Sequence, residues 1–215
     1  MLLDEQIIDN KNKFVELVKM IDREGADIDL LIRQLEHSDF FTAPASTKYH
    51  GSYEGGLCEH CLNVYDNITK LNDTFNLNIP EVSLIIVSLF HDFSKMNLYT
   101  KQPRNVKVYC KPEETKKNSY DELGFYRWES IMEYKVKDPD DRFIFSSHEQ
   151  TSDFMTNTFI PLTVEEHVAI LNHHGGLGYD SNKDLNIVSQ AYSKYPLAMI
   201  LHFADCVDAY GHSND

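Results

Sequence analysis

The segment from Val82 to Phe93 is apolar on nearly every side, and it limits the possible folds more than any other part of the sequence. A helix that is apolar all round must be enclosed by its surroundings. The run is interrupted by Ser83 and Ser88 and is far shorter than the roughly 20 residues needed to span a bilayer. We therefore expect a helix at the centre of a bundle, with His91 and Asp92 at its C-terminal end.

Helical periodicity occurs on both sides of this segment. Apolar residues at steps of three and four predict two helices within residues 1–38, separated by Gly25 and Asp27, and a third over residues 57–71. Thr163 and Glu166 form a capping-box pattern that begins another helix. A last helix is expected over about residues 196–210.

Residues 98–145 differ from the rest because they are polar and rich in aromatic residues. We expect one short helix there, near residues 126–134, and see no convincing strand pattern anywhere in the chain. The predicted fold class is therefore all-α. We expect an N-terminal helical extension over residues 1–45 and a main helical domain over residues 46–215.

Composition and the N-terminal sequence indicate the cellular compartment of the protein and the state of its cysteines. A chain of 215 residues with 42% apolar residues can bury a substantial core without disulfides. The N-terminus lacks the basic start and apolar stretch of a secretory signal, so we expect a cytoplasmic protein with reduced thiols. Cys58 and Cys61 have CxxC spacing but no second close cysteine pair, and we interpret them as packing residues rather than a zinc or redox site.

The formal net charge of −14 argues against long duplex nucleic acid as a partner. A field of this sign repels the phosphates of long duplex nucleic acid unless a local basic patch overrides it. It is compatible with a small nucleotide or a short oligonucleotide as substrate. The sequence predicts no membrane contact, and it leaves open whether the chain forms an oligomer.

Histidine and aspartate residues recur beside segments that are expected to pack inward. Imidazole nitrogens and carboxylate oxygens together suit divalent first-row metals, and an aspartate can bridge two ions. Several such groups buried in one core without a metal would leave many polar atoms to satisfy. The residues are His60, His91, Asp92, His148, His173 and Asp205.

The order of these residues resembles that of the HD-domain metal-dependent phosphohydrolases, which are helical proteins with the pattern His, His-Asp, His, His, Asp. The stretch from His50 to His60 is similar to the first ligand segment of a branch that includes bacterial HD-type 3′-to-5′ exoribonucleases. The other matching segments are His91-Asp92-Phe-Ser-Lys95, Ser147-His148-Glu-Gln-Thr-Ser152, Asn172-His173-His174-Gly-Gly and Ala204-Asp205-Cys-Val-Asp208. The resemblance covers roughly residues 40–210, and Ser94 departs from the glycine common in relatives.

The resemblance implies a fold and a set of ligands. It implies an HD-type helical bundle that binds two divalent ions, with Mn, Fe, Co, Ni, Zn and Mg not distinguished. His60, His91, Asp92 and Asp205 would bind one ion, and Asp92, His148 and His173 the second. Asp92 would bridge the two ions, and His174 would replace or assist His173.

Other residues are expected to act around the metals. Asp92 and Lys95 are the expected catalytic residues, with Lys95 offsetting charge on a bound phosphate. We expect Asp208 and His202 to orient Asp205, and Tyr99, Tyr109 and Trp128 to offer faces for a base. The expected substrate-binding residues are Lys95, His50, Tyr53, Arg104 and Lys107.

The resulting prediction is an enzyme that hydrolyses a phosphate ester or anhydride of a nucleotide with a metal-activated water. Three alternatives remain open. The first is a 3′-to-5′ exonuclease acting on short oligonucleotides. The second is an HD-type oxygenase with a diiron centre. The third is a nucleotide-binding module that retains metal without turnover.

Overall fold

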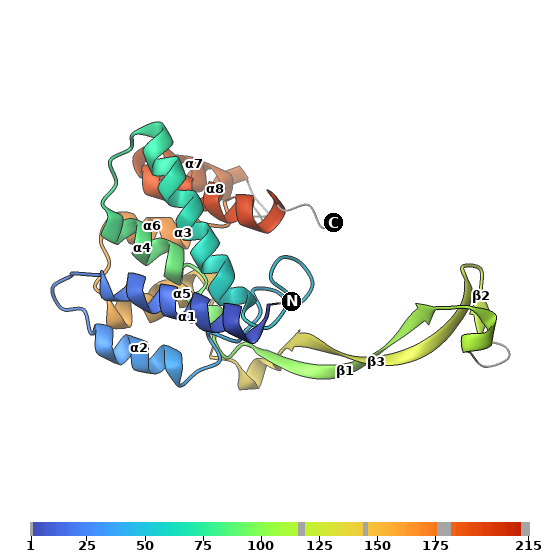
Figure 1. The fold of residues 1–215 in the computed structure, drawn as a ribbon. Coiled ribbons are helices and arrows are strands. Elements are labelled where there is room, and N and C mark those ends of the chain that lie inside the picture. Colours follow the sequence, from blue (N-terminus) through green and yellow to red (C-terminus); the bar gives the residue numbers. More distant parts are fainter. Residues whose placement is uncertain (1, 116–118, 144–145, 176–181, 212–215) are drawn as a thin grey trace.

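The computed structural model describes residues 2–115, 119–143, 146–175 and 182–211. In these residues, eight α-helices form a body from which a long β-hairpin projects (Figure 1). The helices are α1 (Asp4–Lys19), α2 (Ile28–Glu36), α3 (Gly56–Phe75), α4 (Glu81–Phe90), α5 (His148–Phe159), α6 (Val164–Leu171), α7 (Asn182–Lys194) and α8 (Pro196–Gly211). None of the described helices is long and apolar enough to cross a membrane.

Helix α4 lies at the centre of the body, as its apolar sequence predicts. All of its residues from Ser83 to Phe90 are buried. It packs against α1, α3, α5, α6 and α8. The buried Ser88 hydroxyl donates to the Leu84 carbonyl oxygen at 2.7 Å, which satisfies a polar group inside an otherwise apolar helix.

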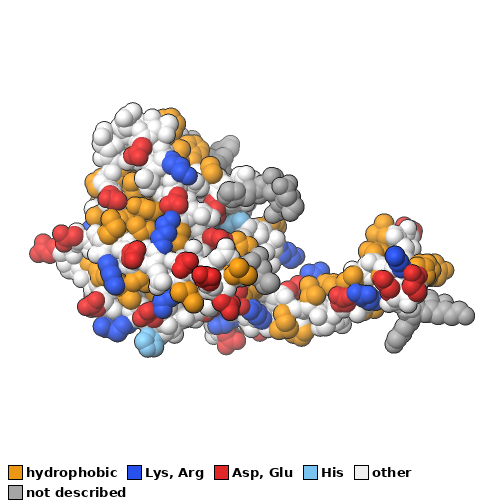
Figure 2. All heavy atoms as spheres, viewed as in Figure 1, with side chains coloured by type: hydrophobic (Ala, Val, Ile, Leu, Met, Phe, Trp, Pro, Cys, Tyr) orange, Lys and Arg blue, Asp and Glu red, His pale blue; other side chains and the backbone are white. Residues whose placement is uncertain are grey.

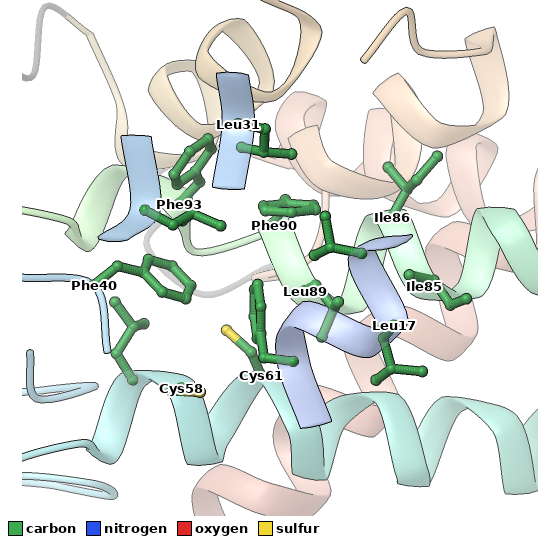
Figure 3. Packing of buried hydrophobic residues seen from close by; sticks show 14 of the residues in the cluster. Leu17, Leu31, Phe40, Cys58, Cys61, Ile85, Ile86, Leu89, Phe90 and Phe93 are labelled. Carbon is green, nitrogen blue, oxygen red and sulfur yellow. The ribbon is translucent and has the colours of Figure 1, made fainter. Parts of the chain in front are cut away.

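The core contains two clusters of buried apolar residues. One joins α1, α2, the loop after α2, α3, α4 and α5, and Figure 3 shows part of it around Phe40, Phe90 and Phe93. Phe14 of α1 packs edge-on against Phe90 with ring centroids 5.8 Å apart. The second cluster joins α3, α4, α6 and α8. The N-terminal helices thus share a core with the helices that carry the candidate site, and the boundary at residue 45 stays a prediction.

The predicted helix starts are confirmed at two places. The Asp27 carboxylate accepts a hydrogen bond from the Leu30 backbone N–H at 2.9 Å and caps α2. Thr163 and Glu166 form the expected capping box of α6. Glu166 is fully buried and also accepts hydrogen bonds from Arg23 at 2.8 Å and Ser83 at 2.7 Å. One carboxylate therefore ties α6 to α4 and to the segment after α1.

The segment over residues 99–136 is a β-hairpin, so the helix predicted at 126–134 is wrong. We call this hairpin the arm. Strand β1 (Tyr99–Tyr109) pairs with β3 (Gly124–Val136) in an antiparallel ladder, and β2 (Tyr120–Asp121) pairs with the start of β3. The fold class is accordingly mainly α with a small three-stranded antiparallel sheet, rather than all-α.

The arm escaped prediction because it has no buried face. Alternation of buried and exposed residues is what identifies a strand, and the described residues of β1, β2 and β3 are all exposed or half-buried. Short 3-10 turns η1 (Phe93–Lys95) and η3 (Pro139–Asp141) lie where the arm leaves and rejoins the body, and a third, η2 (Pro112–Glu114), lies between β1 and β2 at the far end of the arm.

Candidate metal centre

The predicted metal ligands converge at one place in the body. His60 lies on α3, His91 and Asp92 follow α4, and His148 is the first residue of α5. His173 and His174 follow α6, and Asp205 lies on α8. His60, His91, Asp92 and His173 are buried. Three groups have potential ligand atoms within 4.8 Å of one another, namely His60-His91-Asp205, His91-Asp92-His173 and His148-His173-His174.

Two close backbone contacts set the positions of the histidines. Gly56 begins α3 against Gly51, and a Cβ on Gly56 would overlap the Gly51 backbone. This contact holds the loop that carries His50 against the helix that carries His60, and their ring centroids lie 4.8 Å apart. Gly175 has a φ of +62° and lies against the His202 ring. A side chain there would push α8 away from the His173 turn.

The two oxygens of the Asp92 carboxylate face two different sets of histidines. Oδ2 lies 3.4 Å from His60 Nε2 and 3.6 Å from His91 Nε2. Oδ1 lies 3.5 Å from His148 Nδ1 and 3.9 Å from His173 Nε2. Oδ1 is buried and has no hydrogen-bond partner among the described residues. Since an unpaired buried carboxylate oxygen is costly, this arrangement fits a cation at that position.

Backbone carbonyls fix which nitrogen of two histidines carries the proton. His91 Nδ1 lies 2.9 Å from the Ser88 carbonyl oxygen, and His173 Nδ1 lies 2.7 Å from that of Ile170. Because a carbonyl only accepts hydrogen bonds, each Nδ1 must be the donor. Each Nε2 then presents a lone pair to the centre of the site, as a metal ligand does.

His60 is oriented in the same way by a carboxylate. Its Nδ1 donates to Asp208 Oδ2 at 2.7 Å, and Asn63 donates to the other oxygen of Asp208 at 2.8 Å. A histidine that donates to a carboxylate and directs its other nitrogen inward is a common arrangement around bound metals. The sequence correctly marked Asp208 as an orienting residue, but it orients His60 rather than Asp205.

The nitrogen atoms that face the centre are unusually close to one another. His60 Nε2 lies 3.1 Å from His91 Nε2, and His148 Nε2 lies 3.0 Å from His173 Nε2. Two lone pairs at such distances repel unless a proton or a cation lies beside them. The donor set of neutral imidazoles and carboxylates is one that divalent first-row metals prefer. The residues present therefore fit a metal ion.

Burial and charge set the protonation of this cluster. Burial lowers the pKa of His91 and of His148, and lowers that of His173 to about 3, which keeps these rings neutral. Burial also opposes a charge on Asp92, but the Lys95 ammonium outweighs it and holds the Asp92 pKa well below its ordinary value. For His60, burial is outweighed by hydrogen bonds to Asp208 and Asp92, which raise the pKa to about 9 in the absence of metal.

Lys95 lies at the edge of the same cluster. Its Nζ is 2.6 Å from Asp92 Oδ2, and its side chain is only 14% exposed. Lys95 also lines a cavity of about 230 Å³ at the metal ligands, together with His50, Asp92, His174, His202 and Asp205. A cation and several potential ligand atoms thus face one small space.

The remaining predicted residues fall into two groups. His174 stacks on His148 with ring centroids 4.4 Å apart, and its Nδ1 lies 2.8 Å from Glu149 Oε1. Glu149 is a neighbour that the sequence analysis did not single out, although it lies inside the motif at His148. His50 lines the cavity and its Nε2 has no hydrogen-bond partner among the described residues. Tyr53 instead donates to Glu59 Oε2 at 2.5 Å.

Arg104 and Lys107 are not brought to the metal cluster. Both lie on β1 in the arm, where Arg104 pairs with Glu133 at 2.9 Å and Lys107 pairs with Asp121 at 2.7 Å. The ladder carries β1 away from the body (Figure 1). The structure does not place Arg104 and Lys107 beside the metal ligands, and their role in substrate binding stays a prediction.

Neither a known protein family, nor a curated protein, nor a solved structure matches this chain. The assignment therefore rests on the geometry. The protein is mainly helical and contains a buried cluster of histidine and aspartate residues that could hold a metal ion.

Proposed function

We propose that the protein is a metal-dependent phosphohydrolase that cleaves a phosphate ester or anhydride of a nucleotide with water. The observation that carries the proposal is the Asp92 carboxylate, whose two oxygens face two sets of histidines while Lys95 contacts one of them. The ordered resemblance to HD-domain phosphohydrolases supports the same proposal.

Two ions would share Asp92 in this proposal. His60, His91 and Asp205 would hold one, and His148 and His173 the other, with His174 beside them. When bound, such ions make water acidic enough to supply hydroxide near neutral pH and stabilise the oxygens of a displaced phosphoryl group. Asp208 keeps the His60 lone pair directed inward, and the Ser88 and Ile170 carbonyls do so for His91 and His173.

Among the described residues that line the cavity of about 230 Å³, Lys95 is the one lysine or arginine. A phosphate that enters this cavity would meet its ammonium group, which offsets the negative charge that accumulates on the phosphoryl oxygens in the transition state. Burial by itself disfavours the charged lysine, but Asp92 outweighs it and holds the Lys95 pKa above its ordinary value. Lys95 therefore stays charged at neutral pH.

The shape of the site suits a phosphate joined to a larger group. The cavity at the metal ligands, about 230 Å³, is smaller than the roughly 300–1,000 Å³ of typical small-molecule sites. A second cavity of about 690 Å³ adjoins it and shares His50, Ala209 and Tyr210. The phosphate would lie at the metals and the nucleoside beside Tyr53 and His50, where the free His50 nitrogen can hydrogen-bond to it.

The test begins with the purified protein and a measurement of the metals bound to it. Nucleoside mono- and triphosphates, cyclic nucleotides and short oligonucleotides are then screened for hydrolysis with Mn²⁺, Fe²⁺, Co²⁺, Ni²⁺ and Mg²⁺. We expect metal-dependent hydrolysis of at least one class. Asp92→Asn should lose both the hydrolysis and part of the bound metal.

Asp153→Asn is the matched control. Asp153 pairs with His167 at 2.6 Å outside the metal cluster, so this variant should keep both metal and activity. Equal hydrolysis by Asp92→Asn and the wild type would remove the basis of the proposal. Two bound irons with no phosphate release from any substrate would favour the oxygenase alternative instead.

A further inference from the structure

The arm has two chemically different faces. Residues opposite each other in an antiparallel ladder share a face, and successive pairs alternate between the faces. We call one of them the aromatic face. It contains Tyr99, Lys101, Pro103, Asn105, Lys107 and Tyr109 of β1 and Tyr126, Trp128, Ser130, Met132, Tyr134 and Val136 of β3.

The strands of the arm carry more cations than carboxylates. The aromatic face has Lys101 and Lys107 against one carboxylate, Asp121 of β2, which is opposite Gly124. The other face has Arg104, Arg127 and Lys135 against Glu129 and Glu133. In a chain of net charge −14, a local excess of cations is an exception. It is suited to an anionic ligand.

The rings near the far end of the aromatic face are open to solvent. Trp128 is 59% exposed and Tyr109 is 45% exposed. Tyr126 lies between them, with its ring centroid 5.9 Å from that of Trp128 and 6.3 Å from that of Tyr109. Figure 2 shows apolar side chains exposed along the arm and at its far end. Exposed tryptophan and tyrosine rings can stack with bases of any sequence.

The two lysines lie beside these rings. Lys107 Nζ is 4.2 Å from the Tyr126 centroid, and Lys101 Nζ is 5.2 Å from that of Tyr134. Their carboxylate partners are Asp121 of β2, on the same face of the arm, and Glu54, which lies in the body. Water screens such exposed ion pairs, so a phosphate can take the place of the carboxylate.

The aromatic face begins close to Lys95 of the candidate metal centre. Tyr99 follows Lys95 by four residues, and its hydroxyl donates to the Ala45 carbonyl oxygen at 3.4 Å. A small cavity of about 170 Å³ lies between the body and the arm, lined by Pro44, Glu54, Tyr99, Lys101 and Tyr134. From Tyr99, strand β1 runs about 26 Å to Lys107, at roughly 3.3 Å per residue.

We propose that the aromatic face binds a single strand of nucleic acid. Its bases would stack on Trp128 and the neighbouring tyrosines, and its phosphates would lie beside Lys101 and Lys107. Aromatic rings interleaved with cations on an exposed sheet form a common platform for single strands. The acidic body, which repels a long duplex, does not reach this projecting face. Binding here needs no metal and so goes beyond the proposed hydrolysis.

The single tryptophan of the chain provides a direct test, because Trp128 lies on the face itself. Oligothymidylate of about 16 nucleotides, the upper end of the site sizes known for one binding module, is titrated at low salt. We expect saturable quenching of Trp128 emission and a matching rise in the fluorescence anisotropy of a labelled oligonucleotide. Tyr126→Ala should weaken binding on the order of 10-fold.

Ile131→Ala is the matched control, since Ile131 is also on β3 and exposed but lies on the opposite face. It should bind like the wild type. The inactive Asp92→Asn variant should bind as well, which separates a failure of this proposal from a failure of the proposed hydrolysis.

Two outcomes would overturn the proposal. One is binding that is absent, or equally weakened by Tyr126→Ala and Ile131→Ala. The other is a doubled mass by light scattering, with Trp128 emission that depends on protein concentration alone, which would assign the face to a second copy of the chain.

Discussion

The body and the arm are held together in different ways. In the body, side chains such as Phe90 and Phe93 have no exposed surface and pack against several helices. In the arm, no described strand residue is buried, and the structure depends on the ladder and on side chains paired across it. A change in the body should therefore alter stability and the metal centre, whereas a change in the arm should alter only what binds to its surface.

Two lysine-aspartate pairs make the contrast quantitative. Lys95 and Asp92 are 2.6 Å apart with side chains 14% and 3% exposed. Lys107 and Asp121 are 2.7 Å apart with side chains 36% and 30% exposed. The distances are nearly equal but the surroundings differ, since water screens the pair on the arm and not the pair in the body.

The largest effect is expected from a cavity in the body. Phe90→Ala should lower the free energy of unfolding by about 3–5 kcal/mol, because it removes a fully buried ring. Urea denaturation followed by circular dichroism measures this. Trp128→Ala in the arm should cost less than about 0.5 kcal/mol, as is usual for exposed positions. Similar losses for the two variants would contradict the proposed difference between body and arm.

The next effect concerns the lysine pairs. Lys95→Met should slow metal-dependent phosphate release on the order of 100- to 1,000-fold, because an aligned charge is lost from a water-poor site. Lys107→Met should leave the rate of mononucleotide hydrolysis unchanged. Steady-state kinetics measures the rate of phosphate release by each variant. A normal rate for Lys95→Met would exclude a catalytic role for Lys95.

A smaller effect is expected from the group that orients His60. Asp208→Asn should weaken metal binding about 10- to 100-fold, as loss of a carboxylate behind a metal-ligating histidine typically does. Titration with Mn²⁺ or Co²⁺ by calorimetry measures the affinity. If the affinity is unchanged, His60 does not depend on Asp208 as a ligand.

The buried Glu166 predicts a dependence of stability on pH. Burial tends to raise its pKa, but hydrogen bonds from Arg23, Thr163 and Ser83 outweigh this and lower the pKa from its ordinary 4.5. A lowered carboxyl pKa stabilises the fold above about pH 4.5, and that contribution is lost as the pH falls. The unfolding free energy of Glu166→Gln should therefore fall less between pH 7 and pH 4 than that of the wild type, whereas Glu122→Gln, at an exposed turn in the arm, should behave like the wild type.

The smallest effect is expected from removing most of the arm. Replacing residues 102–133 with Asn-Gly joins Lys101 to Tyr134, which are already opposite each other, through a two-residue turn. The unfolding free energy of the body should change by less than about 1 kcal/mol, because none of the removed residues that the structure describes is buried. Metal content should not change, and loss of metal would show that the arm supports the site.

The sequence predicted the fold best where buried apolar residues or helix caps recur at characteristic spacings. The helix before His91 followed from its apolar residues, and the caps at Asp27 and Thr163 followed from local chemistry. The meeting of His60, His91, Asp92, His148, His173 and Asp205 was expected from their order in the chain. The spacing of residues in the sequence does not show which way a side chain points. Asp208, for example, faces His60 instead of Asp205.

The sequence predicted least where the fold brings distant or exposed residues together. Arg23 and Glu166 are far apart in the chain, and their pairing depends on how α6 packs. The sequence predicts a short helix in place of the arm because neither face of the arm is buried. Arg104 and Lys107 appeared close to the site in sequence, but the ladder carries them away from it.

The order of strands in the arm has a consequence for solubility. With β3 between β1 and β2, no described strand pairs with the outer edge of β1, so its backbone groups could recruit a strand from another molecule. Pro103 lacks a backbone N–H, and Lys101, Arg104 and Lys107 place charges along the same strand. These residues are typical of edges that resist pairing with another chain, and they lower the tendency of a long exposed hairpin to aggregate.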